Sequence, residues 1–299
     1  MKNPARLHNV LLFCAILITL GIACPVYAAK SVSEKCAASA TGKVFIENVS
    51  GSIEVAGWSS NEVAVTGTLD DKIERLDFNC DSNRVRIKVI LPEKIRRAGN
   101  ADLKINVPAA GSVDISTVTA GIRVDNVRGA LSLESVTGSI KVAGEPGSVD
   151  VKSVSGDVAI LAATPDVEAQ SVSSSIQLKG IRNKVKASTT SGSIEVGDAN
   201  VLDGSFHTVS GEIRFDGSLT SGANLRIDSL SGSIEAILPR AVSGEFNIST
   251  FSGGISNEFG QTPEKKGRYS PGKKLVFSTG SDARISLETF SGPVILKRK

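Results

Sequence analysis

Few side chains of this sequence belong to the types that carry out chemistry in enzymes. The chain contains two histidines, two tyrosines, one tryptophan and four cysteines. A polysaccharide-acting enzyme on an elongated β fold would need clustered acidic, basic or histidine side chains in a groove, often beside aromatic platforms. The positions expected to point outward beyond the repeat corners instead form a mixed column without paired carboxylates: Arg123, Lys141, Ala159, Gln177, Glu195, Arg214 and Glu235. We therefore expect no catalytic residue, no cofactor and no metal, and an enzyme is the alternative hypothesis.

The first residues have the composition of a leader for export. Lys2 and Arg6 carry the positive charge, and the apolar run over residues 10–23 is short for a bilayer span. Small or tolerated residues at 26–28 favour cleavage after Ala28 or Ala29, so we predict a signal peptide over residues 1–28 and no transmembrane segment after its cleavage. The alternative is an uncleaved anchor.

Cleavage after residue 28 would leave Cys36 and Cys80 as a pair of thiols. In an oxidising compartment such a pair is most simply one disulfide, because a zinc site would need further ligands that the chain hardly contains. A lipoprotein alternative would use Cys24, but Gly21 stands where a leucine is wanted.

Charge argues against a nucleic-acid-binding protein. The chain has 34 basic and 31 acidic side chains, and losing the two basic residues of the leader brings the net charge close to neutral. Basic residues nevertheless gather in two stretches, Arg84, Arg86, Lys88, Lys94, Arg96 and Arg97, and later Lys265, Lys266, Arg268, Lys273 and Lys274. The later stretch is a candidate site for an anionic envelope polymer or for lipid headgroups. The alternative is a solvated face that protects an edge strand.

The organisation of the chain lies in an internal repeat. A Ser or Thr, an apolar residue, a second Ser or Thr and a small residue precede an alternating apolar strand, in copies that begin at Thr117, Ser135, Ser153, Ser171, Thr189, Thr208, Ser229, Thr250 and Thr289. An outlying copy begins at Asn48. From Ala120 to Gly192 the small residue recurs every 18 residues, and later intervals are 19, 21, 21 and 39. Neighbouring repeats must stack, because a slip of one residue would turn every side chain to the wrong face.

This repeat predicts an all-β, single-domain parallel β-solenoid with rungs of 18–21 residues. Each rung would hold two short strands joined by a corner. We expect Val154, Gly156, Val158 and Ile160 to share the inward face, with an apolar pair of the preceding strand, such as Val149 and Val151. A right-handed coil is favoured because parallel crossovers are overwhelmingly right-handed, and the six-residue spacing of left-handed hexapeptide helices is missing.

The same parity places residues 118, 136, 154, 172, 190, 209, 230, 251 and 290, which are apolar except for Thr190, inward and the hydroxyls on both sides of them outward. Two hydroxyl ladders would then run along the rod. We favour a structural role, in which the hydroxyls satisfy backbone groups at a bend. The alternative is a flat array that orders water, as in ice-binding solenoids, or binds a glycan.

The two ends differ from the regular repeats. Residues 29–110 predict an N-terminal cap with the first rungs, in which Trp58 and the Cys36–Cys80 pair help to shield an open edge. Residues 111–299 predict regular rungs, interrupted at 260–274 by a polar segment with two prolines and four lysines, which we expect to be a mobile loop.

Three segments carry a family resemblance: IENVSGSIEVAGWSSNEVAVTG from Ile46, LKINVPAAGSVDISTVTAGIRVDNVRGAL from Leu103 and ARISLETFSGPVILK from Ala283. They resemble the start, middle and end of the bacterial putative-adhesin family, whose function is unknown. The Gly-Trp after the first strand and the repeated Ser-Gly corners are the most specific marks. The resemblance implies a β-helical fold and an extracytoplasmic setting, without catalytic residues or an established ligand.

We therefore expect an exported structural or interaction protein, periplasmic or at the cell surface, whose partner is an envelope polysaccharide or another envelope protein.

Overall fold

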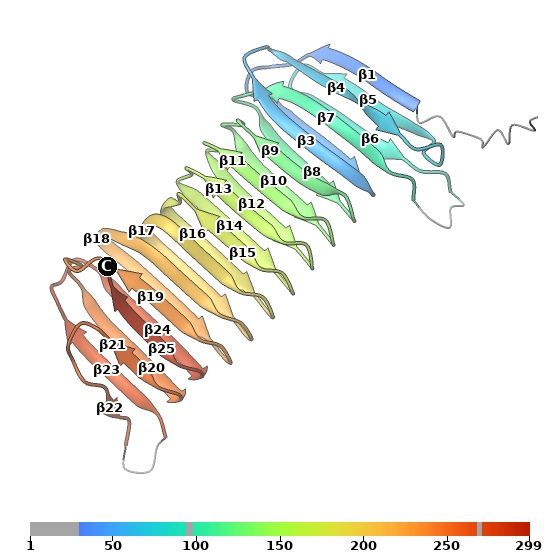
Figure 1. The fold of residues 1–299 in the computed structure, drawn as a ribbon. Helices are drawn as coiled ribbons and strands as arrows, with labels where there is room; N and C mark the ends of the chain where they lie inside the picture. Colours follow the sequence, from blue (N-terminus) through green and yellow to red (C-terminus); the bar gives the residue numbers. More distant parts are fainter. Residues whose placement is uncertain (1–29, 94–97, 268–270) are drawn as a thin grey trace, which may run out of the picture.

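Residues 30–93, 98–267 and 271–299 are described by the computed structural model, and every regular element within them is a β-strand. No membrane-spanning helix occurs in these ranges. The predicted leader lies outside them, as do Lys94, Arg96, Arg97 and Arg268. The strands stack side by side into an elongated rod (Figure 1).

Each regular rung contributes one strand to each of two ladders of hydrogen-bonded strands, which we name ladder A and ladder B. Ladder A stacks in the order β5 (Arg75–Asp81), β6 (Arg84–Ile90), β2 (Lys43–Asn48), β8 (Ser112–Thr117), β10 (Ala130–Ser135), β12 (Ser148–Ser153), β14 (Asp166–Ser171), β16 (Arg182–Thr189), the ends of β17 (Ile194–Thr208) and β18 (Ile213–Ser229), β24 (Arg284–Ser291), β20 (Glu245–Ser252), β23 (Lys273–Ser278) and β22 (Glu264–Lys265).

Ladder B stacks in the order β1 (Lys30–Ala37), β4 (Glu62–Leu69), β7 (Ala101–Pro108), β3 (Gly51–Trp58), β9 (Gly121–Asp125), β11 (Ile140–Gly144), β13 (Val158–Ala162), β15 (Ile176–Lys179), the starts of β17 and β18, β19 (Ile234–Leu238), β25 (Val294–Arg298) and β21 (Ile255–Asn257).

The prediction of a solenoid of stacked rungs agrees with this all-β arrangement, but the prediction of purely parallel pairing is wrong at both ends. Interior neighbours are parallel, whereas β1–β4, β4–β7 and β5–β6 are antiparallel at one end and β20–β23 and β22–β23 at the other. A short turn suffices for an antiparallel neighbour, while a parallel neighbour requires a whole rung. Of these pairs, β5–β6 and β22–β23 are consecutive strands joined by a turn, whereas β1–β4, β4–β7 and β20–β23 join strands that lie further apart in the chain.

Stacking order departs from chain order near both ends. β24 pairs with β18 on one side and β20 on the other, and β25 lies in the same way between β19 and β21 (Figure 1). At the other end β2 lies between β6 and β8, and β3 between β7 and β9. The last rung of the chain is thus hydrogen-bonded along both edges.

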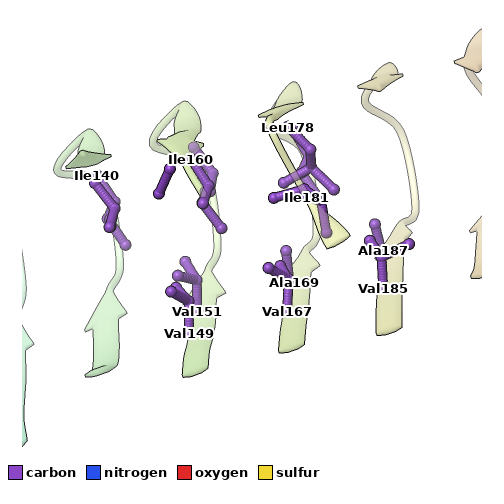
Figure 2. Packing of buried hydrophobic residues seen from close by; sticks show 14 of the residues in the cluster. Ile140, Val149, Val151, Ile160, Val167, Ala169, Leu178, Ile181, Val185 and Ala187 are labelled. Atoms are coloured by element: carbon purple, nitrogen blue, oxygen red, sulfur yellow. The ribbon is translucent and has the colours of Figure 1, made fainter. Parts of the chain in front are cut away.

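Inward side chains of the two ladders meet in a narrow apolar core (Figure 2). Val149 and Val151 of β12, Val167 and Ala169 of β14 and Val185 and Ala187 of β16 are at most 2% exposed, as are Ile140, Ile160 and Leu178 of ladder B. Their register is direct, with Val149 opposite Val167 and Val151 opposite Ala169. The predicted alternation is therefore confirmed along the strands.

At the corners the predicted parity is wrong. Val154, which we expected on the inward face with Gly156, is 45% exposed, while Ser153 before it is buried. The reason is a local turn, since the Gly156 N–H donates to Ser153 Oγ at 3.1 Å and the Ser153 hydroxyl donates to the Gly156 carbonyl at 2.7 Å. A hydroxyl that turns inward to bond the backbone three residues later forces the next side chain outward.

The corner glycines are inside the rung, as predicted, but for a reason different from core space. A Cβ added to Gly156 would lie 2.0 Å from the carbonyl oxygen of Gly138, and one on Gly138 would lie 1.9 Å from that of Ala120. Glycine is therefore favoured because the backbones of stacked corners approach closely.

The segment 260–274 is not simply a loop. Its residues Glu264–Lys265 form β22, which pairs with the start of β23, opposing Glu264 to Lys274 and Lys265 to Lys273. Since β23 in turn pairs with β20, the chain uses this hairpin to cover the C-terminal edge of ladder A.

Candidate functional site

Exposed apolar side chains line one edge of the rod, where each rung turns from ladder A to ladder B. We name these residues the apolar column; each is between 36% and 52% exposed, and they are Val118, Val136, Val154, Val172, Val209, Leu230, Phe290 and Phe251 in stacking order. Thr190 occupies the position between Val172 and Val209. An exposed apolar strip of this length, interrupted at Thr190, is typical of an interaction surface.

The hydrogen bonds beside this column explain both hydroxyl ladders. The first hydroxyl of each copy of the repeat turns inward, as does that of Ser135, whose Oγ accepts a hydrogen bond from the Gly138 N–H at 2.9 Å. The second hydroxyl is exposed, and at Thr119, Thr137 and Ser155 it donates to a backbone carbonyl of the neighbouring rung, as Ser155 Oγ does to Val136 at 3.3 Å. The prediction that both ladders face outward is wrong for the first, while the favoured structural role agrees with these bonds.

Two phenylalanines form the C-terminal end of the apolar column. The rings of Phe251 and Phe290 are stacked, with centroids 4.6 Å apart and planes inclined by 7°. They meet because β20 and β24 pair in register, Thr250 opposite Thr289. About half of each side chain is exposed, which leaves an aromatic surface available for a ligand.

A depression of about 380 Å³ adjoins this aromatic pair. Its apolar lining comes from Leu230, Phe251 and Phe290, and its polar lining comes from His207, Arg226, Asp228, Ser229, Lys266, Glu288 and Thr289. Arg226 Nε lies 2.6 Å from Asp228 Oδ2, and this hydrogen bond raises the pKa of Arg226 above its usual range. Ion-pairing groups of both signs thus surround an apolar platform, a combination suited to a ligand rich in hydroxyls.

The predicted basic site is divided by the fold. Lys266 lines the depression beside the phenylalanines, whereas Lys274 lines a separate depression of about 620 Å³ with Glu245 and Arg284. Lys265 and Lys273 are cross-strand neighbours in the β22–β23 hairpin, and Arg268 lies outside the described residues. Of the predicted candidates that the structure describes, Lys266 is the one that lines the depression beside the apolar column.

The predicted outward column on ladder B has the expected register, with Glu195 opposite Arg214 and Arg214 opposite Glu235. Arg214 and Lys297 both form ion pairs with Glu235, whose side chain is only 9% exposed. Because Glu235 is held between two cations, this part of the column is a structural contact between neighbouring rungs.

The two cysteines join the two ladders at the N-terminal end. A disulfide links Cys36 of β1 to Cys80 of β5, with a Cα–Cα distance of 6.5 Å. β1 is the outer strand of ladder B and β5 the outer strand of ladder A. Within the described ranges, no group of three or more His, Cys, Asp or Glu side chains is arranged to hold a metal ion.

The apolar column was not predicted from the sequence, although the sequence contains a signal for it. Each copy of the repeat has a Ser or Thr three residues before a small residue. At this spacing a side-chain hydroxyl can accept a hydrogen bond from a backbone N–H in a turn. The inward–outward alternation of a strand does not continue through such a turn. The apolar residue that follows the hydroxyl therefore points out of the core.

Comparison with known proteins gives the following similarities. Residues 165–297 match the model of a family described as Toastrack DUF4097, which agrees with the predicted resemblance to a family of unknown function. No match is found among curated proteins. One similar solved structure is a putative adhesin from Bacteroides fragilis, with 12% sequence identity and a TM-score of 0.47 over 90% of this chain and 98% of that chain. Another is a putative lipid binding protein from Parabacteroides distasonis, with 14% sequence identity and a TM-score of 0.40 over 90% of this chain and 97% of that chain. A third is a putative cell adhesion protein from Clostridium sporogenes, with 10% sequence identity and a TM-score of 0.25 over 91% of this chain and 100% of that chain.

Proposed function

We propose that this chain, which belongs over residues 165–297 to the Toastrack DUF4097 family, is an exported, non-enzymatic interaction protein that binds a polysaccharide of the cell envelope, as an adhesin would. The observation that carries the proposal is the exposed, stacked Phe251–Phe290 pair at the end of the apolar column. Export rests on the composition of residues 1–28, and the right-handed coil on the general preference of parallel crossovers.

A polysaccharide suits this surface better than a purely apolar ligand. The apolar side chains repeat once per rung, at about 4.8 Å, so a linear polymer lying along the rod would meet a similar group at each step. Hydroxyls accompany the column at every corner, and the depression adds charged donors and acceptors. The apolar faces of sugar rings would pack on the phenylalanines while the sugar hydroxyls bond to the polar lining.

The test is cosedimentation of residues 29–299 with insoluble envelope polysaccharide. Replacing Phe251 and Phe290 by Ala should weaken binding by a factor of about 5 to 140, because each of the two aromatic contacts contributes ~0.5–1.5 kcal/mol and 1.4 kcal/mol is a factor of ten. Leu161→Ala is the matched control, because Leu161 is 48% exposed on ladder B, outside the column. Equal binding by the double variant and the parent would contradict the proposal.

One observation favours an enzyme as the second candidate function. Asp228 and Glu288 are register partners on β18 and β24, and both line the depression beside the phenylalanines. Two neighbouring carboxylates are the minimum requirement for glycoside hydrolysis. Release of reducing sugars by the parent, abolished in Glu288→Gln with binding intact, would replace our proposal by this one.

A further inference from the structure

A second depression lies on the opposite edge of the rod, where the chain returns from ladder B to ladder A. Its volume is about 640 Å³, and it is lined by Gly57, Trp58, Ser59, Ala109, Asn126, Arg128, Gly144, Glu145 and Ala163. None of these residues belongs to the apolar column or lines its depression. They come from the last residues of β3 and β11 and from the turns after β3, β7, β9, β11 and β13, which are brought together by stacking.

Small residues keep this depression open. A Cβ on Gly57 would lie 2.0 Å from the Asn126 carbonyl oxygen, and Gly144 has a φ of +100°, which disfavours any larger residue. Ala109 and Ala163 are the small side chains beside them. Asn126 itself adopts a φ of 59°, a conformation that asparagine tolerates better than most residues. The side chains of Trp58, Arg128 and Glu145 are the large groups that border the space.

Trp58 is held in place by its own polar atom. Its indole Nε1–H donates to the Glu62 carbonyl at 2.8 Å, across the turn between β3 and β4. The bond satisfies the single donor of the ring, so the ring offers a ligand its face and edge alone. We predicted that Trp58 helps to form the N-terminal cap, and this bond does brace the turn that leads into the antiparallel strand β4. The indole is nevertheless only partly buried and lines the depression.

We propose that the Trp58 depression binds one ring of a neutral oligosaccharide. A fixed indole beside a guanidinium, a carboxylate and a side-chain amide offers a stacking surface together with planar donors and acceptors for sugar hydroxyls. Arg128 and Glu145 carry opposite charges, so the site has no net charge to attract an ion. A volume of about 640 Å³ lies within the range typical of small-ligand sites.

The position of this site gives the rod two independent binding edges. One ligand would occupy the apolar column, and the other would occupy the Trp58 depression near the N-terminal end. The site goes beyond the proposed function, because it shares no residue with the apolar column and takes a soluble ligand.

Trp58 is the only tryptophan of the chain, so its fluorescence reports on this site without a label. We would titrate the protein with two soluble neutral probes, the β-1,4-linked tetrasaccharides of glucose and of N-acetylglucosamine. A saturable change of Trp58 emission with either probe is expected. The substitutions Arg128→Ala and Glu145→Ala should each weaken the affinity for that probe at least tenfold. Lys141→Ala, an exposed cation on ladder B, and the double Phe251→Ala, Phe290→Ala variant should respond like the parent.

Two results would overturn this inference: no saturable change with either tetrasaccharide in the parent, or an unchanged response in both depression variants. Because the polysaccharide cosedimentation depends on Phe251 and Phe290, and the fluorescence on Trp58, either proposal can fail while the other holds. Arg128 and Glu145 are exposed, so their substitution tests the site without disturbing the core.

Discussion

At the scale of the residue, the corner glycines set how closely two rungs can approach. Gly156→Val would place a branched side chain against the Gly138 carbonyl, and we expect a loss of about 1–3 kcal/mol in the free energy of unfolding from overpacking. Gly156→Ala should cost less, since Ala120 and Ser174 already carry a Cβ at equivalent positions. Urea denaturation followed by circular dichroism measures both. A Val variant as stable as the parent would show that the corners separate easily.

The two hydroxyls in each copy of the repeat should differ in their contribution to the free energy of unfolding. Ser153 is buried and forms hydrogen bonds with the Gly156 backbone, so Ser153→Ala should lower the free energy of unfolding by about 1 kcal/mol. Ser155 is exposed, and its replacement by Ala should change stability by a few tenths of that amount. The same denaturation assay compares them. Loss of thermal hysteresis or of glycan binding in the quadruple Ala variant of Ser153, Ser155, Ser171 and Ser173, without loss of stability, would favour the ice- or glycan-binding hypothesis.

At the scale of the element, the disulfide fastens the outer strand of one ladder to the outer strand of the other. The linked cysteines are separated by 44 positions, a loop whose closure is expected to contribute about 3–4 kcal/mol. The double variant Cys36→Ser, Cys80→Ser should therefore unfold at a lower urea concentration. It should also lose amide protection first in β1 and β5. Equal stability of parent and variant would mean that the antiparallel pairings hold the cap unaided.

At the scale of the whole molecule, the inserted last rung predicts an unusual order of local opening. Terminal segments normally fray, but β24 is hydrogen-bonded to β18 and β20 along its two edges. In hydrogen exchange measured by mass spectrometry, peptides from β24 should be protected as strongly as peptides from β12. Strand β21 precedes β24 in the chain, but it pairs with β25 and has only three residues, so it should exchange earlier. Faster exchange in β24 than in β21 would mean that the rungs stack in chain order in solution.

Much of this fold can be predicted from the sequence, because its signals are local and repeated. The 18-residue spacing requires stacked rungs, and the alternation seen at Val149 and Val151 identifies inward side chains without knowledge of any neighbour. Cys36 and Cys80 remain the natural partners of one disulfide once the leader is set aside. Lys266 was among the predicted binding residues, although its position beside two phenylalanines was not foreseen.

The sites themselves depend on tertiary structure. Val154 is exposed because Ser153 bonds the backbone of Gly156, a turn that interrupts the alternation on which the sequence prediction relied. The contact between Phe251 and Phe290 and the insertion of the last rung follow from pairings between segments far apart in the chain. The Trp58 depression needs turns of several successive rungs. Alternation can be read from neighbouring residues and stacking from the 18-residue repeat, whereas the rung order at the ends follows from irregular pairings, such as that of β18 with β24, which no repeat in the sequence marks.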